Sequence, residues 1–101
     1  MSRLQQIDEM LAKKPEDAFL RYARALELKS LGREEDSARE FQTLVEKNPT
    51  YVPTYLMYGT LLAKLGRTEQ ARDVLTRGAE AARRAGNSHA AGEIEEALHT
   101  L

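Results

Sequence analysis

Apolar residues recur along this chain three and four positions apart, which is the spacing of one face of an α-helix. In the first such stretch, Leu4, Ile7, Met10 and Leu11 fall on a single stripe. The same pattern returns in five further stretches. It predicts an all-α fold with helices over residues 3–14, 17–31, 34–48, 51–65, 69–85 and 90–100, joined by short loops.

Prolines and glycines mark where these helices end. Pro15 and Pro49 each close a helix, because proline disfavours the helical conformation in the residue before it and has no amide hydrogen. Gly32, Gly66 and Gly86 are expected to end three of the other helices by adopting the left-handed backbone conformation. Thr68 and Ser88 are expected as the N-caps of the fifth and sixth helices.

The chain repeats itself after 34 residues. The residues that return are Leu28, Leu31, Gly32, Arg33 and Glu35, as Leu62, Leu65, Gly66, Arg67 and Glu69. A constant period of this length marks stacked helix-turn-helix units, which present a surface rather than perform chemistry. Leu28 and Leu31 are expected in the core that holds each helix pair together.

Composition narrows the classes of partner. Lys and Arg total 15 against 16 Asp and Glu, which gives a net charge of -1, so no overall positive field attracts nucleic acid or an anionic membrane. The basic fifth helix has no interleaved aromatic residues that would stack on bases. No apolar run approaches the length of a membrane span. There is no cysteine, and the cytoplasm is the default expectation.

These positions resemble the tetratricopeptide repeat, whose pattern is W-x2-L-G-x2-Y, then A-x3-F, then P. The second repeat carries its signature at Tyr55, Tyr58, Gly59, Leu62, Ala71 and Leu75, with Arg83 in place of the proline. The first repeat carries Arg21, Arg24, Ala25, Leu28, Ser37, Phe41 and Pro49. The resemblance implies a right-handed superhelical stack (α-solenoid) of about six antiparallel helices.

One domain is expected over residues 1–101. Its parts are a half repeat (1–15), a repeat (16–49), a second repeat (50–85) and a capping helix (87–101). Because the chain starts within a half repeat, it is either a piece of a longer array or a small protein of its own.

Two arginines depart from the pattern, since Arg21 and Arg24 stand where the repeat has large apolar residues. In our preferred interpretation, their aliphatic stems lie along the core while the guanidinium groups stay in water. The alternative is that they pair with Asp8 or Glu9 of the opening helix, or with a partner chain.

The resemblance also implies a concave groove that reads a peptide, lined by the first helix of each repeat. By register, the groove candidates are Phe19, Tyr22, Leu26, Lys29 and Ser30, then Pro53, Leu56, Thr60, Ala63 and Lys64, with Ala90 and Ile94 at the far end. Phe19, Tyr22 and Leu26 form one apolar stripe. The alternative is that the last helix, a second copy or neighbouring repeats cover this stripe.

One specialised form of the family groove has no counterpart here. The carboxylate clamp for acidic chaperone tails needs Lys and Asn, but its positions here hold Tyr22, Leu26, Leu56 and Thr60. An apolar ligand segment fits these residues better.

The sequence is compatible with three functions. The first is a protein-interaction module without catalysis, which binds a peptide or protein surface. The second is self-association, and the third is a small-ligand-binding regulatory domain. His89 and His99 are too far apart on one helix to share a metal, so no metal site, cofactor or catalytic residue is expected.

Overall fold

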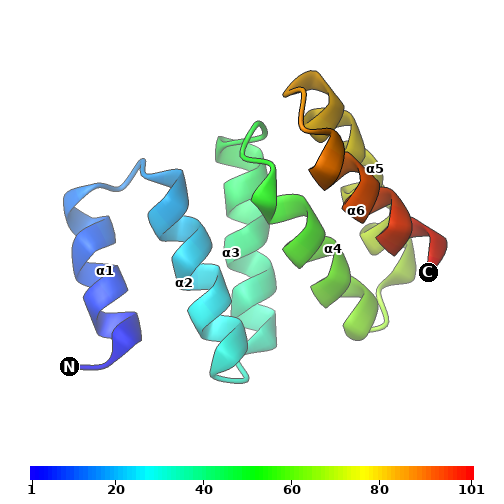
Figure 1. The fold of residues 1–101 in the computed structure, drawn as a ribbon. Coiled ribbons are helices and arrows are strands. Elements are labelled where there is room, and N and C mark those ends of the chain that lie inside the picture. Colours follow the sequence, from blue (N-terminus) through cyan, green and yellow to red (C-terminus); the bar gives the residue numbers. More distant parts are fainter. The chain divides into compact units, whose positions relative to one another are not determined.

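Residues 1–101 are all described by the computed structural model, which contains six α-helices and no strand (Figure 1). The helices are α1 (Arg3–Lys13), α2 (Ala18–Ser30), α3 (Glu34–Lys47), α4 (Pro53–Lys64), α5 (Thr68–Arg84) and α6 (Ser88–His99). The all-α prediction is confirmed, and each predicted end lies within about two residues of the observed one. None of the six helices combines the length and the apolar character of a membrane span.

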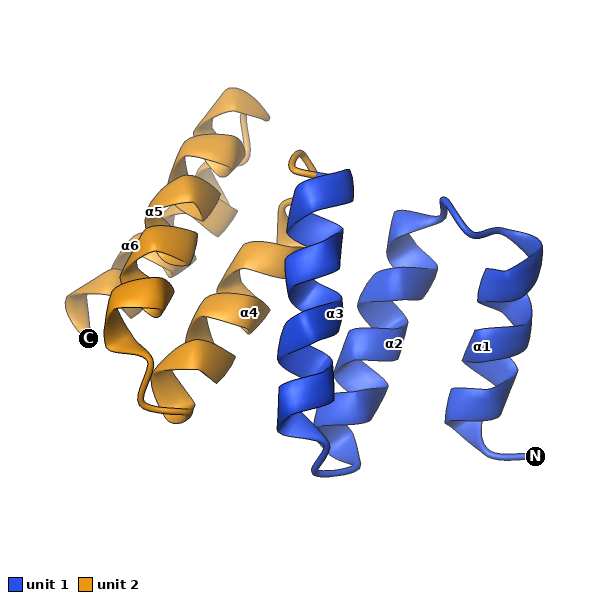
Figure 2. Ribbon diagram, turned by 180° about the vertical axis from the view of Figure 1, so that it is seen from behind, with its two compact units in different colours: residues 1–48 blue, residues 49–101 orange.

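The chain divides into two compact units, Met1–Asn48 and Pro49–Leu101 (Figure 2). In the first unit, α2 packs against both α1 and α3. In the second unit, α4, α5 and α6 pack against one another. Each unit therefore contains one complete helix pair, α2 with α3 or α4 with α5, and one additional helix.

The predicted glycine stops are confirmed, because Gly32 and Gly66 both have φ of 80° and Gly86 has φ of 71°. The turn after α2 closes with two backbone hydrogen bonds. The amide of Gly32 donates to the carbonyl of Lys29, and the amide of Arg33 donates to the carbonyl of Leu28. This is the Schellman arrangement, which needs a residue with positive φ at the glycine position.

Two predicted N-caps are wrong. Thr68 lies inside α5, whose N-cap is Arg67 without a side-chain hydrogen bond. Asn87 rather than Ser88 caps α6, because its side-chain oxygen accepts from the amide of Ala90 at 3.0 Å. Thr68 and Ser88 are themselves the first residues of α5 and α6, so the N-cap of each helix is the residue before.

The core of the first unit forms where α2 crosses α3. Ala25 and Ser37 are fully buried at the crossing, and the Ser37 hydroxyl donates to the Ala25 carbonyl at 2.7 Å. Leu28 and Phe41 are buried beside it. Leu31, in contrast, is 56% exposed, so its predicted place in the core is wrong. It is the C-cap of α2, where the chain turns away from the face that Leu28 buries.

The core of the second unit depends on two glycines. A Cβ atom at Gly59 would lie 2.4 Å from Leu75 Cδ2, and one at Gly78 would lie 2.3 Å from Tyr55 Cβ. Ile94 of α6 approaches the same Gly78 position and is 1% exposed. Ile94 is therefore a core residue, and its expected place at the far end of a groove is wrong.

Candidate functional site

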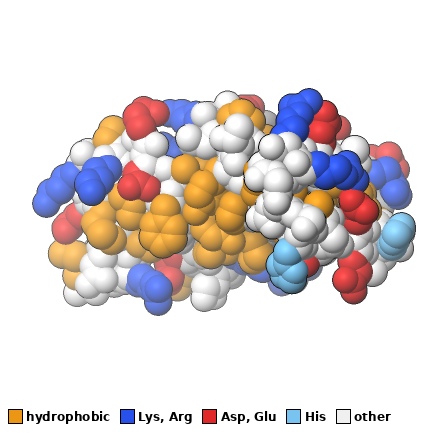
Figure 3. Space-filling model, turned by 45° about the horizontal axis from the view of Figure 1, so that its top comes forward, with side chains coloured by type: hydrophobic (Ala, Val, Ile, Leu, Met, Phe, Trp, Pro, Cys, Tyr) orange, Lys and Arg blue, Asp and Glu red, His pale blue; other side chains and the backbone are white.

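Helix α2 carries the candidate residues of the first unit. Phe19, in its first turn, is 63% exposed, whereas Tyr22, Leu26 and Lys29 are partly buried. Hydrophobic side chains gather at the surface over this unit in Figure 3. We call Phe19, Tyr22 and Leu26 the α2 stripe. Its first residue, Phe19, is exposed to solvent, and the other two are partly buried.

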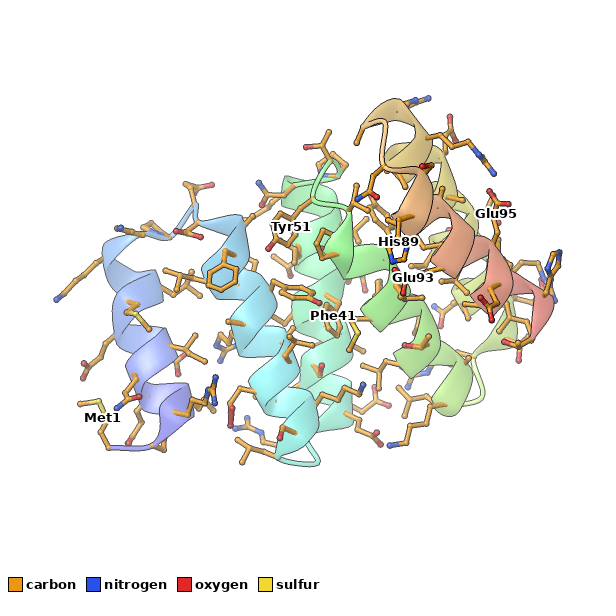
Figure 4. The ribbon with its side chains drawn as sticks, in the orientation of Figure 1. Met1, Phe41, Tyr51, His89, Glu93 and Glu95 are labelled. Atoms are coloured by element: carbon orange, nitrogen blue, oxygen red, sulfur yellow. The ribbon has the colours of Figure 1, made fainter.

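Tyr22 links this stripe to the core. Its ring centroid lies 6.3 Å from that of Phe41, and the two planes are inclined by 58°. Phe41 lies on α3, is labelled in Figure 4 and is fully buried. Such tilted aromatic pairs are favourable because a ring edge meets a ring face. Tyr22 therefore supports the stripe, and Phe19 is its most accessible aromatic side chain.

Helix α4 carries the candidate residues of the second unit. Pro53 is its first residue and is exposed, as are Thr60 and Lys64, whereas Leu56 is partly buried. The Thr60 hydroxyl donates to the carbonyl of Met57 at 3.1 Å. This face is more polar than the α2 stripe.

Glu40 is the partner of both unusual arginines. Its two carboxylate oxygens accept from Nη1 of Arg21 at 2.8 Å and from Nη1 of Arg24 at 2.5 Å. The side chains of Arg21 and Glu40 are only 16% and 10% exposed, so the preferred interpretation of a water-exposed guanidinium group is wrong for Arg21. The alternative is right for Arg24, because its Nε donates to Asp8 at 2.7 Å.

These ion pairs connect all three helices of the first unit, because Asp8 lies on α1, Arg24 on α2 and Glu40 on α3. Burial lowers the pKa of Arg24, but hydrogen bonds to Asp8 and Glu40 outweigh it and raise that pKa above its ordinary value. The guanidinium therefore stays charged and holds both carboxylates. We call Asp8, Arg21, Arg24 and Glu40 the ion network.

The sequence interpretation missed Glu40, although a signal was present. The position 34 residues later is Val74, an apolar residue buried in α5. A charged residue at this core position, together with arginines in place of Tyr55 and Tyr58, indicates three coordinated departures from the repeat.

A second feature that sequence reasoning missed is a hollow of about 420 Å³ within the second unit. The residues that line it come from the start of the unit and from α4 and α5: Pro49, Thr50, Tyr55, Arg77, Glu80, Ala81, Arg84 and Ala85. Burial raises the pKa of Tyr55, and the positive charge of Arg77 opposes that rise. The hydroxyl of Tyr55 donates to the carbonyl of Pro49 at 2.5 Å.

The two histidines do not form a catalytic pair. His89 and His99 are both exposed on α6. His89 lies one turn from Glu93 (Figure 4), and its Nε2 is 3.5 Å from the Glu93 carboxylate. When protonated, it forms an ordinary helix-surface ion pair.

Comparison with solved structures identifies the family. A tetratricopeptide repeat domain protein from Salinibacter ruber matches with 37% sequence identity and a TM-score of 0.82, over 85% of this chain and 87% of that one. The chain belongs to the tetratricopeptide repeat family. A tetratricopeptide repeat family model also matches residues 40–73. None of the curated proteins matches the chain.

Two structures of lower sequence identity share the fold. The TPR2B domain of yeast Sti1, solved as a complex with pHsp70, has 23% identity and a TM-score of 0.87, over 95% of this chain and 77% of that one. A protein from Bordetella parapertussis has 19% identity and a TM-score of 0.83, over 99% of this chain and 87% of that one. Tetratricopeptide repeat domains generally bind protein or peptide partners and are generally not catalytic.

Proposed function

We propose that this chain is a protein-interaction module that binds a peptide or protein segment through the α2 stripe and has no catalytic activity. The observation that carries the proposal is Phe19, a large aromatic side chain that is 63% exposed. The helix that presents it is held by packing against both α1 and α3. An aromatic residue on a rigid element is a typical anchor of an interface.

The chemistry of the stripe favours an apolar ligand segment. Tyr22 and Leu26 extend the surface of Phe19 by one and two turns along α2, and Lys29 follows in its last turn. A ligand with an apolar side chain opposite Phe19 and an acidic group opposite Lys29 matches this order. Because Tyr22 and Leu26 occupy clamp positions, a purely acidic tail is a poorer match.

The corresponding face of α4 is proposed for the same role in the second unit. Its residues are Pro53, Leu56, Thr60 and Lys64. Yeast Sti1, whose domain was solved with pHsp70, supports a peptide-binding role through the shared fold alone.

A peptide library displayed on phage tests the proposal. The wild-type chain selects a peptide, and the affinity of the synthetic peptide is then measured by isothermal titration calorimetry. The variant Phe19→Ser removes the exposed ring, and Leu31→Ser is its matched control because Leu31 is 56% exposed at the other end of α2. Both variants should retain the wild-type circular dichroism, since exposed positions change stability by only about 0.5 kcal/mol.

The proposal predicts that Phe19→Ser weakens binding by about thirtyfold or more, equivalent to about 2 kcal/mol for an anchor residue. Leu31→Ser should leave the affinity within about twofold. Equal affinities for both variants would refute the proposal. If the wild-type chain is instead a dimer in sedimentation equilibrium, and Phe19→Ser dissociates it, the stripe binds a second copy.

A further inference from the structure

The hollow of the second unit is distinct from the proposed interaction surface. None of its lining residues belongs to the candidate set on α4, and α5 forms one of its walls. Its volume of about 420 Å³ is within the range of sites that hold a few side chains or a small ligand.

The hollow exists because the second repeat departs from the first. Arg83 stands where the period places proline, and α5 continues to Arg84, whereas α3 ends at Lys47 before Pro49. The alanines that line the hollow, Ala81 and Ala85, correspond to the larger Lys47 and Tyr51 of the preceding period. Small side chains at these two positions leave space beside the helix.

The floor of the hollow is apolar and rigid. Tyr55 is 3% exposed, and its hydroxyl is already bound to the carbonyl of Pro49. The Tyr55 ring packs over Gly78, where no Cβ would fit. The ring of Pro49 and the methyl groups of Ala81 and Ala85 complete a surface that suits an apolar side chain.

The rim of the hollow carries two arginines. Arg77 and Arg84 have side chains that are 62% and 78% exposed, and they lie seven residues apart on α5, which is about 10.5 Å along a helix. Arg77 uses Nη2 toward Asp73, and Arg84 uses Nη2 toward Glu80. The other N–H groups of each guanidinium are available to an acceptor.

The lining as a whole is positively charged. Of its residues, Arg77 and Arg84 are cationic and only Glu80 is anionic. Asp73, which pairs with Arg77, is not part of the lining. The hollow therefore offers an apolar floor between two positive groups, and an acidic ligand complements it.

We infer that this hollow binds an acidic peptide segment in which two carboxylates flank an apolar side chain. In an extended polyproline II segment, residues three positions apart lie on the same side about 9 Å apart, close to the spacing of the arginines. The carboxylates accept hydrogen bonds from Arg77 and Arg84, and the apolar side chain between them contacts Tyr55 and Ala81. Charge-assisted pairs of arginine and carboxylate supply the specificity.

The test uses the acetylated and amidated tetrapeptide Glu-Pro-Leu-Glu, with Gln-Pro-Leu-Gln as the uncharged control. Each is titrated into the complete ¹⁵N-labelled chain while amide chemical shifts are recorded. The inference predicts that the acidic peptide shifts the amides of Thr50 and of residues 77–85. The uncharged peptide should bind at least about fivefold more weakly, because two exposed ion pairs are lost.

Three variants locate the site. Arg77→Gln combined with Arg84→Gln removes both cations, Ala81→Gln fills the floor with a longer side chain that adds no charge, and Arg72→Gln is the matched control. Arg72 is exposed on α5 but does not line the hollow. The double variant and Ala81→Gln should each weaken binding at least about fivefold, and Arg72→Gln less than about twofold.

Two results would overturn the inference. One is an equal loss of affinity in Arg72→Gln and in the double variant, which would indicate general charge attraction. The other is a set of shifts centred on Phe19 and α2, with none at Thr50. That outcome would remove the hollow as a site but leave the proposed role of the α2 stripe intact.

Discussion

Arg21 and Tyr55 occupy the same position of successive repeats, and each donates a hydrogen bond to the carbonyl of the proline six residues before it. Arg21 Nη2 reaches the Pro15 carbonyl at 3.0 Å, and the Tyr55 hydroxyl reaches the Pro49 carbonyl at 2.5 Å. Two chemically different side chains therefore fasten the same turn. The two side chains differ in charge: the largely buried cation Arg21 requires the carboxylate of Glu40 as a partner, whereas the neutral Tyr55 requires none.

The ion network makes the first unit sensitive to the loss of Glu40. We predict that Glu40→Val lowers the free energy of unfolding by about 3 kcal/mol, because it leaves the largely buried Arg21 without a carboxylate and leaves Arg24 with Asp8 alone. Glu46→Val, on the exposed side of the same helix, carries the same helix-propensity cost and should lose less than about 1 kcal/mol. Urea unfolding monitored by circular dichroism measures both. If both variants lost the same free energy of unfolding, the ion pairs of Glu40 would contribute nothing to stability.

The second repeat already contains an apolar version of this network. Tyr55, Tyr58 and Val74 are the counterparts of Arg21, Arg24 and Glu40. We predict that combining Arg21→Tyr, Arg24→Tyr and Glu40→Val restores most of the stability that Glu40→Val removes. Replacing a complete buried ion group by apolar residues is often neutral or stabilising, whereas breaking it is not. A triple variant less stable than Glu40→Val in urea would contradict this account.

Much of the fold is predictable because its signals are local. Pro15 and Gly32 each end a helix through the conformation of one or two residues, so their effect can be recognised without knowing the tertiary structure. The ion network is not local. Arg21 and Glu40 lie 19 positions apart, and whether they meet depends on how α2 packs against α3.

The candidate site likewise has one feature that local sequence predicts and others that depend on tertiary packing. The spacing of Phe19, Tyr22 and Leu26 predicts a common stripe on one helix. Which of them stays exposed depends on Phe41, which comes from another helix and covers part of Tyr22. The hollow beside Arg77 and Arg84 depends on the packing of Tyr55 over Gly78, so periodicity alone could not indicate it.

Two glycines in the second unit should respond in opposite directions to alanine. At Gly78, a Cβ would lie 2.3 Å from Tyr55 Cβ, so Gly78→Ala should cost about 1–3 kcal/mol through overpacking. At Gly92 on α6, no atom lies within 4 Å, so Gly92→Ala should stabilise by up to about 1 kcal/mol through helix propensity. Urea unfolding tests both variants. Equal stability of the two would contradict the close approach of Tyr55 to α5.

Asp36 should titrate at an unusually low pH. Hydrogen bonds from Arg33 and then Arg39 lower the pKa of its carboxyl below the ordinary value. Because the folded-state pKa is lowered, its stabilising effect is present above the ordinary aspartate pKa and is lost as the pH falls through the lowered value. Carboxyl ¹³C resonances followed against pH measure the titration. Arg33→Gln should raise the pKa, and an Asp36 pKa at or above the ordinary value in the wild type would refute the prediction.

The most direct test of the α2 stripe as the partner-binding surface is photo-crosslinking to the peptide selected by the wild-type chain. The photoreactive residue p-benzoylphenylalanine is introduced at Phe19 in one variant and at Leu31 in another, both exposed positions of comparable apolar character. Mass spectrometry after illumination should detect the covalent peptide adduct with the Phe19 variant and only background with the Leu31 variant. An adduct formed equally at both positions, or only at Leu31, would contradict the account.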